Sequence, residues 1–291
     1  MTLKDPRTAG ARPPFPKQQQ PAPGATPKLD PPADHGEESY RGAERLKDTV
    51  ALITGGDSGI GRAVAIAFAR EGADVVIAYL KEHEDAEETA RWVRKAGRKA
   101  VVIAGDVADE KHCRELVART VSELGRIDIL VNNAAFQRTH AKLWDFTAEE
   151  IETTFRTNIE SMFHLAKAAA AKMKPGASII NTASIQADKP SPSLLAYAAT
   201  KGAIANFTGG LAQLVAADGI RVNAVAPGPV WSPLIPSTMP AEKVSQFGSD
   251  SPLGRPAQPA ELAGAYVFLA SNQASYVSGA VLPVTGGKPF L

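Results

Sequence analysis

The chain has 291 residues, room for one large or two small domains, and its 32 Lys and Arg residues balance 31 Asp and Glu residues. This balance provides no general attraction to nucleic acid or to anionic lipid. The single cysteine, Cys113, excludes an intrachain disulfide and fits a reducing, cytoplasmic compartment. The five histidines show no zinc-site spacing, so we expect no metal, and no apolar run approaches the ~20 residues of a membrane span.

Residues 1–40 form a proline-rich arm that differs in composition from the rest of the chain. Nine of the 22 prolines fall between Pro6 and Pro32, and no secretory signal pattern is present. Proline removes a backbone donor and fixes φ, so this stretch forms neither a helix nor a central strand. We expect an arm draped over its own or a neighbouring subunit, with a freely mobile tail as the alternative.

Residues 41–291 follow the pattern of one α/β domain, in which short apolar runs alternate with helical segments. This alternation predicts a single doubly wound (Rossmann) parallel sheet of about seven strands, with helices on both faces. The expected strands cover 49–54, 74–79, 99–104, 127–131, 177–180, 220–225 and 280–284. The expected helices cover 62–70, 84–96, 110–124, 148–172, 194–217 and 258–270, and 227–257 is expected to be loop with short helices.

A glycine-dense turn follows the first expected strand and opens the first helix. Gly55 allows a tight turn, Gly59 removes a side chain where a diphosphate approaches, and Gly61 lets the helix pack closely on the strand. The helix N-terminus offers free N–H groups and a partial positive charge. Asp57 has the wrong sign for a phosphate ligand, so we expect it to point away or to cap the helix. The turn predicts a dinucleotide site.

The end of the second expected strand bears on the choice between NAD and NADP. Enzymes that prefer NAD commonly place a carboxylate there for the ribose 2′-hydroxyl. This chain has Tyr79, Leu80 and Lys81 at these positions, and the first acid is Glu82. Lys81 could pair with a 2′-phosphate, or it is simply solvated. We therefore favour NADP and leave the use of NAD open.

Ser184, Tyr197 and Lys201 are the candidate catalytic groups. Tyr197 and Lys201 are four residues apart in a segment rich in Ala and Leu, so on a helix they share one face. A nearby ammonium favours the phenolate and would lower the pKa of Tyr197, which makes this residue a candidate acid or base. Ser184 follows an apolar run, and a hydroxyl at a strand end can bond a substrate oxygen. Alone, such a pair on a helix is most often a surface feature.

Several motifs occur in a fixed order along the chain. They are Thr54-Gly55-x-x-x-Gly59-x-Gly61, Asn132-Asn133-Ala134-Ala135, Asn158, Ser184, Tyr197-x-x-x-Lys201 and Pro227-Gly228. Together, over about residues 48–287, they resemble the short-chain dehydrogenase/reductase family. With the arm, they look like a bacterial branch described as general stress proteins or glucose/ribitol-dehydrogenase-like oxidoreductases. Two departures are Ala135, where the family usually has glycine, and Ser232, where it often has threonine.

The resemblance implies a role for each candidate catalytic residue. Tyr197 exchanges a proton with the substrate oxygen, and Ser184 hydrogen-bonds the substrate carbonyl. Lys201 binds the nicotinamide ribose and stabilises the tyrosinate. Asn158 holds a water in a proton relay through Lys201, with a helix-packing amide as the alternative.

The resemblance also implies cofactor contacts from several parts of the chain. Asp106 would contact the adenine and Asn132 would lie on the adenosine side, while Val230 and Ser232 would meet the carboxamide. The full set is Gly55, Asp57, Ser58, Gly59, Ile60, Gly61, Tyr79, Lys81, Asp106, Val107, Asn132, Ala134, Tyr197, Lys201, Pro227, Gly228, Val230 and Ser232.

We interpret the chain as an NAD(P)-dependent oxidoreductase that transfers hydride between nicotinamide and a small neutral aldehyde, ketone or polyol. Substrate contacts are expected from 185–193, from the segment after Ala135 and from the loop 231–255. The apolar side chains of that loop, such as Trp231, either favour an apolar or small neutral substrate or pack a lid. The alternatives are a catalytically silent dinucleotide-binding regulator and a structural assembly protein. The resemblance implies a homotetramer.

Overall fold

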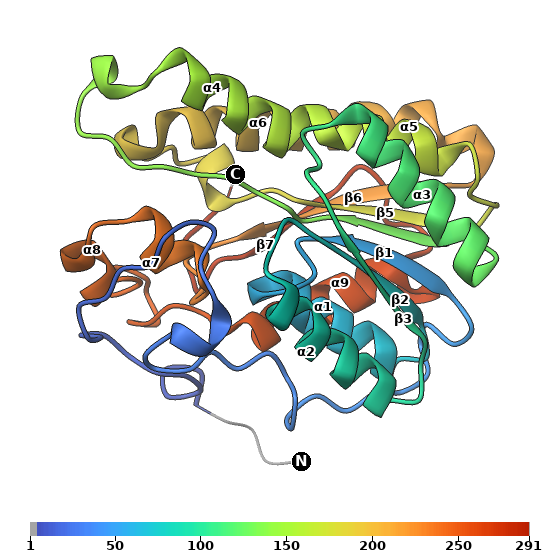
Figure 1. Cartoon of the computed structure of the whole chain (residues 1–291), viewed down its shortest axis with the longest axis horizontal. Coiled ribbons are helices and arrows are strands. Elements are labelled where there is room, and N and C mark those ends of the chain that lie inside the picture. Colours follow the sequence, from blue (N-terminus) through green and yellow to red (C-terminus); the bar gives the residue numbers. More distant parts are fainter. Residues whose placement is uncertain (1–4, 291) are drawn as a thin grey trace.

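Short apolar runs form the strands at the centre of the molecule. The structure is a computed structural model that describes residues 5–290. Within that range, seven parallel strands pair in the order β3-β2-β1-β4-β5-β6-β7 (Figure 1), which confirms the predicted doubly wound parallel sheet. Their bounds are β1 (Val50–Thr54), β2 (Asp74–Tyr79), β3 (Ala100–Ala104), β4 (Ile129–Asn132), β5 (Ser178–Thr182), β6 (Arg221–Pro227) and β7 (Val281–Val284).

Two layers of helices cover the sheet, one on each face (Figure 1). One apolar cluster joins α1, α2 and α9 to the sheet, and a second joins α3, α5 and α6 to it. These strands are apolar on both faces because helices bury both of them. The first layer is α1 (Gly59–Arg70), α2 (His83–Lys95) and α9 (Pro259–Ala270), and the second is α3 (Glu110–Leu124), α4 (Ala148–Phe155), α5 (Ser161–Ala170) and α6 (Leu195–Leu214).

The helix expected over 148–172 is interrupted in the structure. One turn of π-helix, Arg156–Glu160, separates α4 from α5. Asn158 lies in this turn, where its Oδ1 accepts from Phe136 N at 2.7 Å and its Nδ2 donates to Phe136 O at 2.9 Å. A π turn contains one more residue than an α turn, and such bulges are frequent at functional sites. The pattern of apolar residues does not reveal this interruption, because the helix resumes in the same direction.

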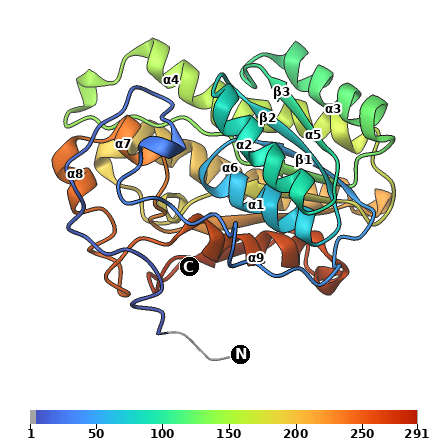
Figure 2. The ribbon, with the colours of Figure 1, turned by 60° about the horizontal axis from the view of Figure 1, so that its bottom comes forward.

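The carboxyl ends of the strands meet at the edge where the strand order reverses, between β1 and β4. Ligands of open parallel sheets bind in the crevice at such a point. Two short helices, α7 (Leu234–Thr238) and α8 (Ala241–Ser245), lie within the proline-rich segment expected to be loop with short helices. Figure 2 shows the arm running along α8 and α7 and then past α2 towards α9.

Residues 5–290 show neither a membrane-spanning helix nor a metal-binding cluster. No helix there is both long enough and apolar enough to cross a membrane. The same residues contain no group of three or more His, Cys, Asp or Glu side chains that could hold a metal ion.

Candidate active site

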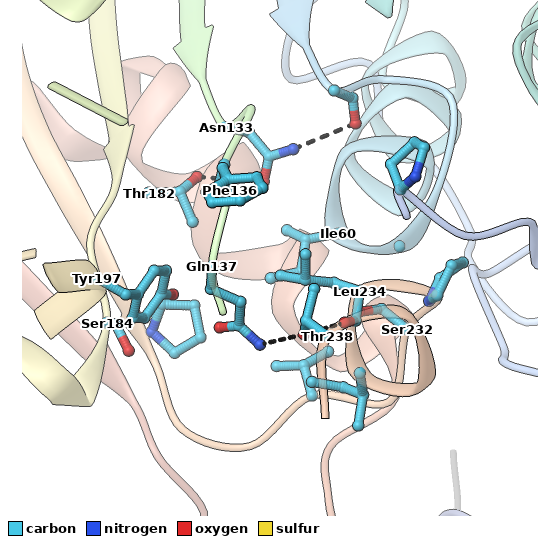
Figure 3. Close-up of a pocket in the computed structure, with 18 of the residues that line it drawn as sticks. Ile60, Asn133, Phe136, Gln137, Thr182, Ser184, Tyr197, Ser232, Leu234 and Thr238 are labelled. Atoms are coloured by element: carbon cyan, nitrogen blue, oxygen red, sulfur yellow. Dashed lines mark hydrogen bonds between the residues drawn. The ribbon is translucent and has the colours of Figure 1, made fainter. Parts of the chain in front are cut away.

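A cavity of ≈ 840 Å³ opens at the carboxyl ends of the central strands. The glycine turn after β1 forms one wall, and the segment that carries α7 and α8 forms the facing wall. Residues that follow β2, β4, β5 and β6 line the space between them (Figure 3). The volume falls within the range of about 300–1,000 Å³ that is typical of small-molecule sites.

Ser184, Tyr197 and Lys201 all line this cavity. Tyr197 and Lys201 lie one turn apart on α6, and Lys201 Nζ is 5.2 Å from the centroid of the Tyr197 ring. Ser184 follows β5, and its Oγ accepts a hydrogen bond of 3.1 Å from Gln186 N. Figure 3 shows Ser184 and Tyr197 side by side at the cavity. A substrate oxygen bound there can therefore meet two hydroxyl groups.

Burial shifts the pKa values of both titratable groups of this set. It raises the pKa of Tyr197 to about 12, although the Ser184 hydroxyl acts in the opposite direction. It lowers the pKa of Lys201 to about 7. The expected lowering of the Tyr197 pKa is therefore wrong in this structure, because loss of solvation on burial outweighs the opposing hydrogen bond with Ser184. The phenol stays protonated at neutral pH.

The main chain holds Lys201 in place. Its Nζ donates to Thr182 O at 2.7 Å, and the residue is only 1% exposed. Thr182 Oγ1 is in turn hydrogen-bonded to the phenol oxygen of Tyr266, on α9, at 2.8 Å. Tyr266 therefore supports the strand end that positions Lys201. Nothing in the sequence pointed to Tyr266, because its contact depends on how α9 packs against β5.

Asn158 lies behind the cavity and is fully buried. Besides its two bonds to Phe136, its Nδ2 donates to Thr200 Oγ1 at 3.1 Å. Its side chain thus joins the segment after β4 to α6, next to Lys201. These contacts describe a positioning amide, and the proton relay predicted for Asn158 stays a prediction.

The glycine turn is shaped to accept a ligand close to the main chain. Gly55 and Gly59 have φ values of +61° and +49°, which L side chains rarely adopt. A Cβ on Gly59 would lie 3.0 Å from Ser232 Cβ, and a Cβ on Gly61 would lie 1.9 Å from Gly55 O. Gly59 and Ile60, the first residues of α1, line the cavity, so the helix N-terminus faces it. This arrangement fits the diphosphate of a dinucleotide.

All the predicted cofactor residues line the cavity except Gly61 and Asn132. Gly61 packs the start of α1 against the turn. Asn132 requires a correction, because it is 1% exposed and its Nδ2 donates to Asn181 Oδ1 at 2.9 Å. It joins β4 to β5 within the buried core, and its neighbour Asn133 lines the cavity instead. The motif contains two adjacent asparagines, and the sequence does not show which of them faces the ligand.

The cavity wall at the end of β2 carries charges of both signs. Lys81 is exposed there, and Glu82 and Asp57 line the same part of the cavity. Burial raises the pKa of Asp57 to about 6, and the negative charges of Asp85 and Glu82 add to this shift. Ser58 holds the N-cap position of α1, so the expectation that Asp57 caps this helix is wrong, and Asp57 is among the residues that line the cavity.

Neutral polar side chains line the substrate end, and the sequence did not identify them individually. Gln137 Nε2 donates to Thr238 Oγ1 at 2.9 Å, across the gap between the segment after β4 and α7 (Figure 3). Trp231 does not line the cavity, because it is fully buried against Phe15 of the arm. Other apolar side chains of that loop do line the cavity, so both alternatives stay open; they are Leu234, Ile235, Met239 and Phe247. The polar set is Gln137, Thr139, Gln186, Ser191, Ser193 and Thr238.

Known proteins resemble this chain along most of its length. A family model described as enoyl-(acyl carrier protein) reductase matches residues 55–288. General stress protein 39 of Bacillus subtilis (strain 168) is 54% identical over 266 residues, 91% of this chain and 93% of that protein. Glucose and ribitol dehydrogenase of Daucus carota is 48% identical over 278 residues, 94% of this chain and 96% of that protein.

Solved structures share the fold. A short chain dehydrogenase from Burkholderia cenocepacia J2315, in complex with NADP, is 32% identical, with a TM-score of 0.79 over 84% of this chain and 98% of that chain. A short chain dehydrogenase from Mycobacterium paratuberculosis, bound to NAD, is 30% identical, with a TM-score of 0.77 over 84% of this chain and 98% of that chain. The chain belongs to the short-chain dehydrogenase/reductase family of NAD(P)-dependent oxidoreductases.

Proposed function

We propose that the protein interconverts a small, neutral, hydroxylated carbonyl compound and the corresponding alcohol, using NAD or NADP. The observation that carries this proposal is a shared cavity. Ser184, Tyr197 and Lys201 line the same space as the glycine turn that fits a diphosphate. With the diphosphate held by the turn, the nicotinamide would therefore lie beside the carbon of a C–O group whose oxygen is held by the two hydroxyl groups.

Each part of a dinucleotide has residues to hold it. The glycine turn and the first residues of α1 would bind the diphosphate, and the end of β2 would bind the adenosine ribose. Lys201 would bind the nicotinamide ribose, and Val230 and Ser232 would meet the carboxamide. When bound, the nicotinamide supplies or accepts the hydride.

Tyr197 is the proposed general acid of carbonyl reduction. Because the pKa of its phenol is about 12, the proton is present at neutral pH and can pass to the substrate oxygen as that oxygen gains negative charge. Ser184 stabilises the same charge by donating a second hydrogen bond. Lys201 stabilises the resulting tyrosinate when protonated, and Asn158 is the proposed link of the relay that returns a proton. Alcohol oxidation needs the deprotonated phenol and is favoured at higher pH.

The substrate end supports a polyhydroxylated ligand. Hydroxyl groups of a substrate need partners when buried, and the amides of Gln137 and Gln186 and several Ser and Thr hydroxyls line this part of the cavity. The name of the Daucus carota relative, glucose and ribitol dehydrogenase, agrees with this class. We therefore place polyols and aldoses ahead of apolar ketones.

A panel assay tests both the reaction and the substrate class. Each dinucleotide is combined with ribitol, other polyols, aldoses, aliphatic aldehydes and aliphatic ketones, and absorbance of the reduced nicotinamide is followed. We expect faster turnover of polyols or aldoses than of apolar ketones, and a Tyr197→Phe control without significant turnover. Turnover of apolar ketones alone would contradict the substrate class. Tight dinucleotide binding without turnover of any compound would favour the alternative, a dinucleotide-binding regulator.

The proposal also covers the oligomeric state, the location and the domain division of the protein. We infer a homotetramer from the family resemblance, and the apolar side chains that Ile151, Phe163 and Leu195 expose on α4, α5 and α6 fit contacts between subunits. Light scattering tests this inference, and a monomer at all concentrations would contradict it. A cytoplasmic location, suggested by cysteine use, and the division into an arm (1–40) and a catalytic domain (41–291) also remain proposals. Cell fractionation and limited proteolysis test them.

A further inference from the structure

The arm is hydrogen-bonded to the two short helices that cover the cavity. Phe15 N donates to Ser245 O at 2.8 Å, and Ser245 Oγ donates to Phe15 O at 2.8 Å. Further along the arm, Gln20 N donates to Pro236 O at 2.9 Å. These bonds join main-chain groups of the arm to α8 and α7.

An apolar cluster anchors the arm beside these bonds. Phe15 is 5% exposed, and its ring centroid lies 4.4 Å from that of the fully buried Trp231. Trp231 Nε1 donates to Pro31 O at 2.8 Å, so two separate points of the arm hold one indole. Leu29 and Ile235 belong to the same cluster. Burial of a large apolar side chain is favourable, so Phe15 anchors the arm to the segment that follows Trp231.

Between these anchors the arm forms part of the cavity wall. Ala22 and Pro23 line the cavity, and Ser237 Oγ donates to Pro23 O at 3.0 Å. The approach to α7 is so close that a Cβ on Gly24 would lie 2.6 Å from Pro233 O. Gly24 therefore permits the contact that brings the arm over the cavity.

The arm then reaches the opposite wall. Thr26 N donates to Asp85 Oδ2 at 2.9 Å, and Asp85 Oδ1 accepts from Arg62 Nη2 at 2.9 Å. Arg62 Nε donates to Asp57 O, in the glycine turn, at 2.9 Å. A continuous set of hydrogen bonds thus connects α7, through the arm, to the turn that fits the diphosphate. All members of the set belong to this chain.

We propose that residues 15–31 of the arm are a positioning element of the active site. They hold the α7–α8 segment against the glycine turn, so that the dinucleotide and the substrate are enclosed between walls of fixed separation. This inference rests on the proposed function, because it takes the cavity to be the dinucleotide and substrate site. It assigns to the arm a contribution to ligand affinity besides any contribution to folding.

Gly24→Ala in the full chain is the direct test, and Gly125→Ala is its matched control. Both glycines have a left-handed backbone, with φ of +92° and +83°, but a Cβ on Gly125 would meet nothing within 4 Å. The control therefore carries the backbone strain without the collision. In Gly24→Ala the new Cβ collides with Pro233 O as long as the arm stays in place, so the variant favours movement of the arm away from α7.

The readouts are the dissociation constants of NADH and NADPH, measured by nucleotide fluorescence, and hydrogen exchange at the amides of Phe15 and Gln20. We expect Gly24→Ala to weaken binding about tenfold and to raise KM more than it lowers kcat, as a change of about 1.4 kcal/mol would. Exchange at both amides should become faster in this variant. Gly125→Ala should stay within about twofold of the wild type on all these measures.

Phe15→Ala removes the apolar anchor of the arm and serves as a second test if Gly24→Ala folds poorly. We expect the same weakening of dinucleotide binding from it. Unchanged dissociation constants in the variants that fold overturn the proposal, as does equal weakening by Gly125→Ala. Both results leave the proposed function standing, provided that the wild type binds a dinucleotide. A wild type that binds neither NADH nor NADPH overturns the proposed function and this proposal together.

Discussion

The two walls of the cavity hold their shapes by different means. The glycine turn between β1 and α1 is built from eight consecutive residues, 54–61, and its shape depends on main-chain geometry and on the absence of side chains. The facing wall depends on contacts between residues 200 or more positions apart, as in the bonds from Trp231 to Pro31 and from Ser245 to Phe15. The residues of the turn alone determine the shape of the first wall, whereas the second wall forms only when segments far apart in the sequence pack together. The two walls should therefore respond differently to substitution.

Tyr197 lies between the walls, and its replacement should have the largest effect on activity. Tyr197→Phe removes the proposed acid and base but keeps the ring, so we expect turnover to fall by at least ~100-fold with nearly unchanged dinucleotide affinity. Steady-state kinetics and nucleotide fluorescence measure the two quantities separately. A variant that retains most of its turnover would remove Tyr197 from the chemistry and leave the cavity without an assigned acid.

On the glycine-turn side, Gly61→Ala should destabilise the protein itself. The added Cβ would lie 1.9 Å from Gly55 O, and a main-chain oxygen in a tight turn cannot move away at low cost. We expect a loss of about 2–3 kcal/mol in the free energy of unfolding, measured by denaturant titration. Gly209→Ala, on α6, is the control, because its Cβ would meet nothing within 4 Å. Helix propensity should make this control slightly more stable, by about 0.5–1 kcal/mol. Equal stability of the two variants would mean that the main chain of the turn can move away from the added Cβ at little cost.

The same contrast explains which parts of the molecule the sequence predicted. Strand and helix periodicity located the elements of the sheet, and motif spacing brought Ser184, Tyr197 and Lys201 to one cavity. Local patterns could not show the π turn around Asn158, since a single additional residue leaves the helical pattern almost unchanged. They also could not show that Tyr266 supports Thr182, or that Phe15 packs on Trp231. These contacts depend on tertiary packing between segments that no local pattern connects.

Lys201 offers a test of the buried charge between the two walls. Burial lowers the pKa of Lys201 to about 7 in the folded protein, from 10.5. Between these values the unfolded chain binds more protons than the folded one, so this group makes the wild type more stable as pH rises. Lys201→Met lacks the effect. We expect the stability difference, wild type minus variant, to rise by about 2 kcal/mol between pH 7 and pH 9.

Denaturant titrations of both proteins at several pH values measure this difference. Loss of the bond to Thr182 O lowers the free energy of unfolding of the variant by a similar amount at every pH. The change of the stability difference with pH therefore reports only the charge of Lys201. The window ends at pH 9 because the pKa of Tyr197, raised from 10 to about 12, affects stability only at higher pH. Parallel pH curves for the two proteins would show that Lys201 keeps an ordinary pKa despite its burial.

The smallest expected effect concerns the choice of dinucleotide, at the end of the glycine-turn wall. Lys81 favours a 2′-phosphate, whereas Asp57 and Glu82 line the same region and oppose it. Asp57 is only 8% exposed and Lys81 is exposed, so solvent and salt screen the lysine more strongly. We therefore expect the wild type to bind NADH more tightly than NADPH, which reverses the preference for NADP expected from the sequence. Asp57→Asn should raise the affinity for NADPH relative to NADH about fivefold, and Lys81→Ala should lower it by less than that.

The pH dependence of this preference separates Asp57 from Lys81. Because the pKa of Asp57 is about 6, lowering the pH from 7.5 to 5.5 protonates the carboxyl and should shift the wild type towards NADPH. A 2′-phosphate also gains a proton near pH 6, but that change affects the wild type and Asp57→Asn alike. A shift that exceeds the one seen in Asp57→Asn is therefore due to the carboxyl. If the two proteins shift equally, Asp57 does not face the ribose, and the charge of Lys81 decides the preference alone.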